Sequence, residues 1–112
     1  MSKEQHYEKG MDYFANDRLD LAVEELKKAV MLDSEYGDAL HALAMCYYHR
    51  EDFDSALQYG KKFRDVEPSN PLAYTSLSMF YNAQGMIQQA EAMGAEAKRV
   101  GGEEDSEAVS LS

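Results

Sequence analysis

The sequence contains a single cysteine, Cys46, so no disulfide can form within the chain. A chain that folds without disulfides is typical of a reducing compartment. The sequence also lacks a secretory signal, because polar residues at positions 2–5 lead directly into a helical pattern. No apolar run is long enough to cross a bilayer. We therefore expect a cytoplasmic protein.

Basic residues are scarce. The 112 residues include 11 lysines and arginines against 21 aspartates and glutamates, which gives a formal net charge of −10. Four of the acids, Glu103, Glu104, Asp105 and Glu107, lie near the C-terminus without a neighbouring base. A chain with this charge repels phosphate backbones and anionic lipid. We expect neither nucleic acid nor a membrane as a partner, and favour a basic or apolar one.

Motifs of catalysis are missing as well. No nucleophilic residue is followed or preceded by a general base at the spacing of a known catalytic motif. There is also no glycine-rich phosphate loop and no carboxylate pair. Gly60, Gly85 and Gly94 occupy positions typical of helix packing and turns. We therefore expect no enzymatic activity and no cofactor.

Two histidines and the cysteine are residue types that bind metals. His41 and His49 are eight residues apart in one helical pattern, with Cys46 between them. Eight residues rise about 12 Å along a helix, which is too far for two ligands of one ion. We therefore expect no metal site.

What the sequence does contain is helical periodicity throughout. Apolar residues three and four apart in residues 19–30 predict an amphipathic helix whose Glu24, Glu25, Lys27 and Lys28 face water. Ser2 followed by Gln5 predicts a capping box at the first helix, and Asn70-Pro71 predicts the start of another. Turn signals lie at 16–17, 33–34, 67–71 and 84–85. The pattern predicts six helices joined by short turns.

The helices repeat at a fixed interval. Tyr13, Tyr47 and Tyr81 are equally spaced along the sequence. Four further columns of apolar or small residues keep the same interval: Gly10, Ala44 and Ser78; Leu19, Phe53 and Ile87; Ala22, Ala56 and Ala90; Ala29, Phe63 and Ala97. Five columns that share one period of about 34 residues, without a gap, indicate three copies of a single unit.

The middle copy carries a known signature. It follows the pattern W-x2-L-G-x2-Y, A-x3-F and P with Leu40, Leu43-Ala44, Tyr47, Phe53, Ala56 and Pro68. The chain thus resembles the tetratricopeptide repeat (TPR) family over roughly residues 3–102. The resemblance implies an all-α fold, a right-handed α-solenoid of three helix-turn-helix units with six antiparallel helices. We expect one domain over 1–102, with repeats at about 3–36, 37–70 and 71–102, and an acidic disordered tail at 103–112.

The resemblance also implies a binding surface. In this family the first helix of each repeat lines a concave groove, and a step of one repeat returns to the same place on the next first helix. Met11, Met45 and Met79 then form a methionine ladder, which suits an apolar ligand, although single methionines at such positions are also common core residues. The full expected groove comprises Tyr7, Met11, Phe14, His41, Met45, Tyr48, His49, Thr75, Met79 and Asn82, with an acidic rim of Glu4, Glu8 and Asp38.

We therefore expect a non-catalytic adaptor that binds an apolar or amphipathic protein segment, with basic residues beside its apolar anchors. The alternatives are a structural protein that forms homo-oligomers, through the groove or an apolar patch around Met86, Met93 and Val100, and a dedicated chaperone of a single client. Some family members hold the C-terminal carboxylates of chaperone peptides with lysine, asparagine and arginine. The matching positions here are Tyr7, Met11, Ala42, Thr75 and Met79, so we expect no such clamp.

Overall fold

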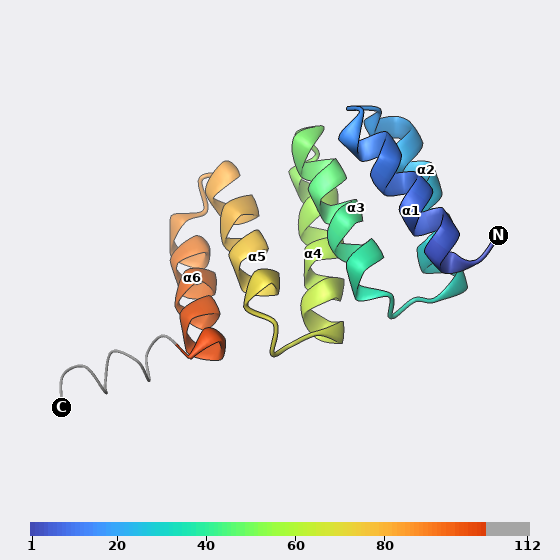
Figure 1. The fold of residues 1–112 in the computed structure, drawn as a ribbon. Helices are drawn as coiled ribbons and strands as arrows, with labels where there is room; N and C mark the ends of the chain where they lie inside the picture. Colours follow the sequence, from blue (N-terminus) through green and yellow to red (C-terminus); the bar gives the residue numbers. More distant parts are fainter. Residues whose placement is uncertain (103–112) are drawn as a thin grey trace.

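A computed structural model describes residues 1–102 as six α-helices arranged in three antiparallel hairpins. Figure 1 shows the hairpins side by side in chain order, so that the chain forms an α-solenoid, as predicted. The helices are α1 (Lys3–Ala15), α2 (Leu19–Leu32), α3 (Gly37–His49), α4 (Phe53–Val66), α5 (Pro71–Ala83) and α6 (Ile87–Gly101). The predicted disorder of residues 103–112 lies outside the described residues.

Local sequence signals set the helix ends. The Ser2 Oγ accepts a hydrogen bond from the Gln5 backbone N–H, and the Gln5 side chain accepts one from the Ser2 N–H at 2.8 Å, which completes the predicted capping box. Asn70 caps α5 and Pro71 is its first residue, as predicted. At the far end, Gly102 stops α6 in a left-handed conformation.

The turn inside each hairpin uses the same backbone device. Asp17, Glu51 and Gly85, which occupy the same position in successive repeats, have φ angles of 59°, 63° and 75°. A left-handed conformation costs a residue with a side chain about 1–2 kcal/mol, whereas glycine adopts it freely. The predicted turn role of Gly85 is confirmed, and the first two hairpins carry strain that the third does not.

The core lies between neighbouring hairpins. Leucines and aromatic rings from α2 to α5 fill it, and its largest fully buried side chains are Leu26, Leu40, Leu43, Phe63, Leu77 and Phe80. Gly60 on α4 makes close packing possible, because a Cβ there would lie 3.0 Å from the Leu77 Cδ2 and 3.1 Å from the Phe80 ring. The predicted packing role of Gly60 is therefore confirmed. Among residues 1–102, no helix is both long and apolar enough to span a membrane.

Glu25 is buried, so the prediction that its side chain faces water is wrong. The residue is 6 % exposed. Its carboxylate accepts hydrogen bonds from the His6 Nδ1 at 2.9 Å and from the Lys28 Nζ at 3.0 Å. These two donors hold the pKa of Glu25 below its usual range. The sequence pattern of α2 could not show this, because the partner that allows burial comes from α1.

Candidate functional site

All ten residues of the predicted groove lie on α1, α3 or α5, the first helices of the three hairpins. The three methionines, Met11, Met45 and Met79, are each half-buried and pack against the core. Tyr7, Phe14, His41 and Tyr48 are half-buried too, whereas His49, Thr75 and Asn82 are exposed. The methionine ladder thus belongs partly to the core and partly to the surface.

Aromatic contacts tie one end of these helices together. The Phe14 ring on α1 lies 5.5 Å from the His49 ring on α3, in an edge-on geometry. Tyr48 lies 5.5 Å from His49 and 5.3 Å from Phe80 on α5, measured between ring centroids. Edge-on and tilted pairs at these distances are favourable. The contacts form a continuous aromatic row across the three helices.

His41 is held between helices. Its ring centroid lies 5.0 Å from that of Phe63, and its Nε2 is in hydrogen-bond contact with the Ser76 Oγ on α5 at 3.1 Å. Burial lowers the pKa of His41, an effect that Asp38 and Glu67 partly oppose. His41 and His49 therefore have separate packing partners. Within residues 1–102, no three histidine, cysteine or acidic side chains are grouped so as to hold a metal ion.

The predicted acidic rim, Glu4, Glu8 and Asp38, is exposed. Tyr7 and Tyr36 lie near it, with ring centroids 5.4 Å apart. Burial, followed by the charge of Asp38, raises the pKa of Tyr7. Burial also raises the pKa of Tyr36, with smaller effects from Glu4 and Asp38. Glu4 and Asp38 thus place negative charge near these two rings, whereas the Lys3 Nζ lies 5.2 Å from the Tyr36 ring centroid.

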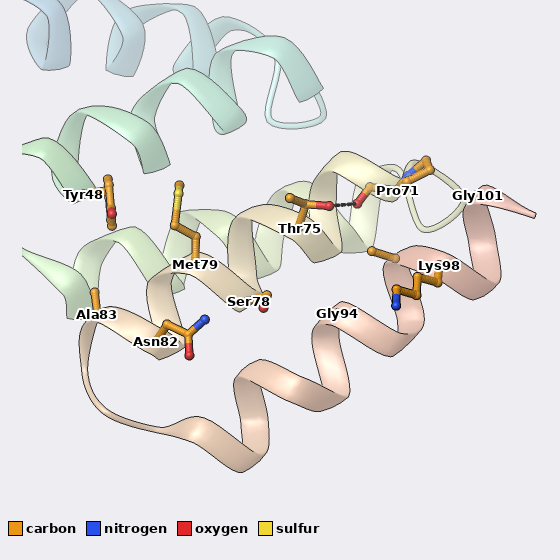
Figure 2. Close-up of a pocket in the computed structure, with 11 residues that line it drawn as sticks. Tyr48, Pro71, Thr75, Ser78, Met79, Asn82, Ala83, Gly94, Lys98 and Gly101 are labelled. Carbon is orange, nitrogen blue, oxygen red and sulfur yellow. Dashed lines mark hydrogen bonds between the residues drawn. The ribbon is translucent and has the colours of Figure 1, made fainter. Parts of the chain in front are cut away.

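A cavity of about 840 Å³ lies at the other end of the solenoid, between α5 and α6 (Figure 2). It brings together four predicted groove residues, Tyr48, Thr75, Met79 and Asn82. The other six predicted groove residues do not line it. The remaining lining residues are Pro71, Ser78, Ala83, Gly94, Ala97, Lys98 and Gly101.

The α6 wall of this cavity was not predicted from the sequence. The family resemblance assigns binding to first helices, and α6 is a second helix. One available signal was Gly94, which occupies the column of Leu26 and Gly60. The leucine of the first repeat is replaced there by glycine, which has no side chain, and this leaves space on the surface of α6.

The chemistry of the cavity suits binding. The Ser78 Oγ donates to the Ala90 carbonyl at 2.8 Å, and the Thr75 Oγ1 donates to the Pro71 carbonyl at 3.2 Å. Both hydroxyl protons are therefore satisfied within the protein. Lys98 is the charged residue in the lining, and no nucleophile there stands with a base. The surface can hold apolar groups and, at Lys98, an acid.

Comparisons with known proteins agree on the fold. A family model described as tetratricopeptide repeat matches residues 13–59. No curated protein sequence matches the chain. Among solved structures, a crystal structure of MamA is 25% identical, with a TM-score of 0.89 over 94% of this chain and 61% of the MamA chain. This chain thus spans about three fifths of that relative.

Two further structures share the fold at lower identity. The first TPR of Spaghetti (RPAP3), bound to the HSP90 peptide SRMEEVD, is 18% identical, with a TM-score of 0.85 over 88% of this chain and 79% of that chain. A chain of the CopN-Scc3 complex is 13% identical, with a TM-score of 0.84 over 88% of this chain and 58% of that chain. At these identities the likeness shows the fold alone.

Proposed function

The chain is a tetratricopeptide repeat protein, and from that premise we propose that it is a non-catalytic adaptor. It binds an apolar or amphipathic segment of another protein across α1, α3 and α5. The observation that carries this proposal is the methionine ladder, three half-buried thioethers at the same place in α1, α3 and α5, the first helices of successive hairpins. Methionine side chains are flexible and polarisable, so they adapt to varied apolar partners.

The expected affinity follows from the apolar surface area that the bound segment covers. A segment that covers ~500 Å² of apolar surface gains about 12 kcal/mol at ~25 cal/mol per Å². Loss of translational freedom and ordering of the segment offset several kcal/mol of this gain. The remainder, about 8 kcal/mol, corresponds to micromolar affinity. Such binding is reversible, as an adaptor requires.

The negative charge beside the groove determines which charged residues the ligand carries. The exposed acids Glu4 and Asp38 lie where α1 and α3 begin, and the exposed Glu8 lies one turn further along α1, so the bound segment carries lysine or arginine there. An acidic peptide such as SRMEEVD, which the RPAP3 domain binds, is a poor ligand for this surface. Tyr7 and Met11 on α1 offer it no cation, and the cation that lines the cavity beside Thr75 and Met79 is Lys98, on α6.

Selection from a displayed library of amphipathic peptides tests the proposal. We expect enrichment of peptides with methionine, leucine or phenylalanine at helical spacing beside lysine or arginine. The SRMEEVD peptide serves as the negative control. Enrichment of acidic peptides, or none above an unrelated control protein, contradicts the proposal.

Self-association is the second candidate, and exposed apolar residues support it at a different place from the one predicted. Met86, Met93 and Val100 are half-buried, and Met93 and Val100 pack against the core, so the predicted patch is covered in part, although the adjacent Ile87 is 52 % exposed. Met31 and Leu32, at the end of α2, are instead 85 % and 59 % exposed. A solution mass that rises with concentration in the wild type but not in Met31→Lys supports this candidate. A constant monomer mass contradicts it.

A further inference from the structure

The cavity between α5 and α6 lies on a helix face that is covered elsewhere in the solenoid. α2 packs against α3, and α4 packs against α5. Within residues 1–102, no helix follows α6 to cover it in the same way. Figure 2 shows Gly94 and Lys98 on α6 facing α5 across the open space. The last hairpin therefore presents the surface that the first two bury.

The preceding hairpin shows what fills such a space. Gly60 and Gly94 are one repeat apart and occupy the same place on α4 and α6. At Gly60, a Cβ would meet the Leu77 side chain at 3.0 Å and Phe80 at 3.1 Å. At Gly94, a Cβ would meet the Ser78 Oγ, at 3.8 Å. Gly94 thus offers the same depression without the leucine that fills it one hairpin earlier.

The chain itself supplies a leucine in the corresponding position. Leu111 follows Gly94 at the same separation in sequence at which Leu77 follows Gly60. The positive φ of Gly102 turns the chain directly after Gly101, which lines the cavity. We propose that residues 103–112 bind back onto this cavity and that Leu111 inserts over Gly94, as Leu77 packs over Gly60.

Charge favours the same occupant. Residues 103–112 contain four acids and no base, Glu103, Glu104, Asp105 and Glu107. Lys98 lines the cavity in the last turn of α6, next to Arg99, which is ion-paired with Glu96 at 2.7 Å. Acidic groups near Lys98 are attracted at short range. A segment with this composition gains little from folding alone and orders when it binds.

A second copy of the chain fits the cavity less well. If copies stacked end to end, α1 of one copy would pack against α6 of another copy. This contact would resemble the packing of α3 against α2 and of α5 against α4. Lys9 and Asp12 of α1 occupy the columns of Leu43 and Cys46, which are fully buried in α3. End-to-end stacking would therefore bury two charges at the contact, which is costly. The polar face of α1 points instead to an occupant from within the chain.

Nuclear magnetic resonance of the full chain tests the proposal without any partner protein, so its outcome is independent of the proposed groove function. Backbone amide signals of Ser78, Gly94 and Ala97 are compared among wild type, Leu111→Ser and Val109→Ser. Val109 is the matched control, because it stands one repeat length after the exposed Thr75. We expect the three signals to shift in Leu111→Ser and to stay in place in Val109→Ser.

Two results overturn the proposal. In the first, the three amide signals are the same in wild type and Leu111→Ser. In the second, the signals depend on protein concentration while the solution mass doubles, which means that the segment fills the cavity of another copy.

Discussion

Replacing Gly10 by alanine tests how tightly the first hairpin is packed. Gly10 is buried on α1 opposite Leu26. An added Cβ would lie 2.7 Å from the Leu26 Cγ and 2.9 Å from its Cδ2. Leu26 is fully buried, so its side chain has no open space into which to withdraw. We therefore expect Gly10→Ala to destabilise the protein although alanine is the better helix former.

Two opposing magnitudes decide the size of the effect. Alanine in place of glycine inside a helix contributes about 1 kcal/mol. Overpacking a full core costs ~1–3 kcal/mol, and two contacts shorter than 3.0 Å place this site near the upper end. The expected net loss is about 2 kcal/mol in the free energy of unfolding. Urea denaturation followed by circular dichroism measures it as a lower midpoint at an unchanged slope.

A double-mutant cycle with Leu26→Ala assigns the loss to this one contact. Leu26→Ala alone leaves a cavity and costs ~2–5 kcal/mol. In the double variant the new methyl group of residue 10 no longer meets the leucine, so the combined loss is smaller than the sum by about 1 kcal/mol or more.

Ala92→Gly provides the control for helix propensity alone, because Ala92 is exposed within α6 and we expect a loss of up to ~1 kcal/mol. Stabilisation by Gly10→Ala as large as that loss, or strict additivity in the cycle, refutes the reasoning.

Three further predictions concern single groups. Glu51→Gly relieves the positive φ of 63° and raises the unfolding midpoint by the equivalent of about 1 kcal/mol, whereas a lowered midpoint refutes the strain. Burial raises the pKa of the Cys46 thiol to about 11, so iodoacetamide at pH 8 labels the native protein far more slowly than the denatured one; equal rates contradict this. The pKa of His41 is lowered in the fold, so the unfolded state takes up the proton first as pH falls below ~6.5 and stability declines. His41→Gln flattens this decline in denaturation series between pH 7.5 and 5, and an unchanged decline assigns it to other groups.

The sequence was sufficient for the fold because its signals are local and repeated. Capping at Ser2 and Asn70 depends on residues within three positions, and the repeat columns register one hairpin against the next. Glu25 was predicted wrongly because its burial depends on His6, which is 19 residues away on another helix. Periodicity within one helix contains no information on such a partner.

The candidate site was predictable only in part. The first-helix positions follow from the period, and four of them, including Thr75 and Met79, line the cavity. The opposite wall exists because Gly94 and Ala97 leave space that no described helix fills. A cavity remains where no neighbouring helix packs against a helix face. The residue pattern within one helix does not show which other helices will cover it.

The affinity of a selected peptide for Met45→Glu, measured by calorimetry, tests the central claim most directly. Met45 is half-buried in the middle of the ladder, so a carboxylate there loses hydration when an apolar segment binds. We expect affinity to fall by about 100-fold, equivalent to ~2.7 kcal/mol. Gln58→Glu, on the exposed side of α4, adds the same charge elsewhere and leaves the affinity unchanged. Equal affinities of Met45→Glu and wild type, with helicity intact in both, contradict binding across α1, α3 and α5.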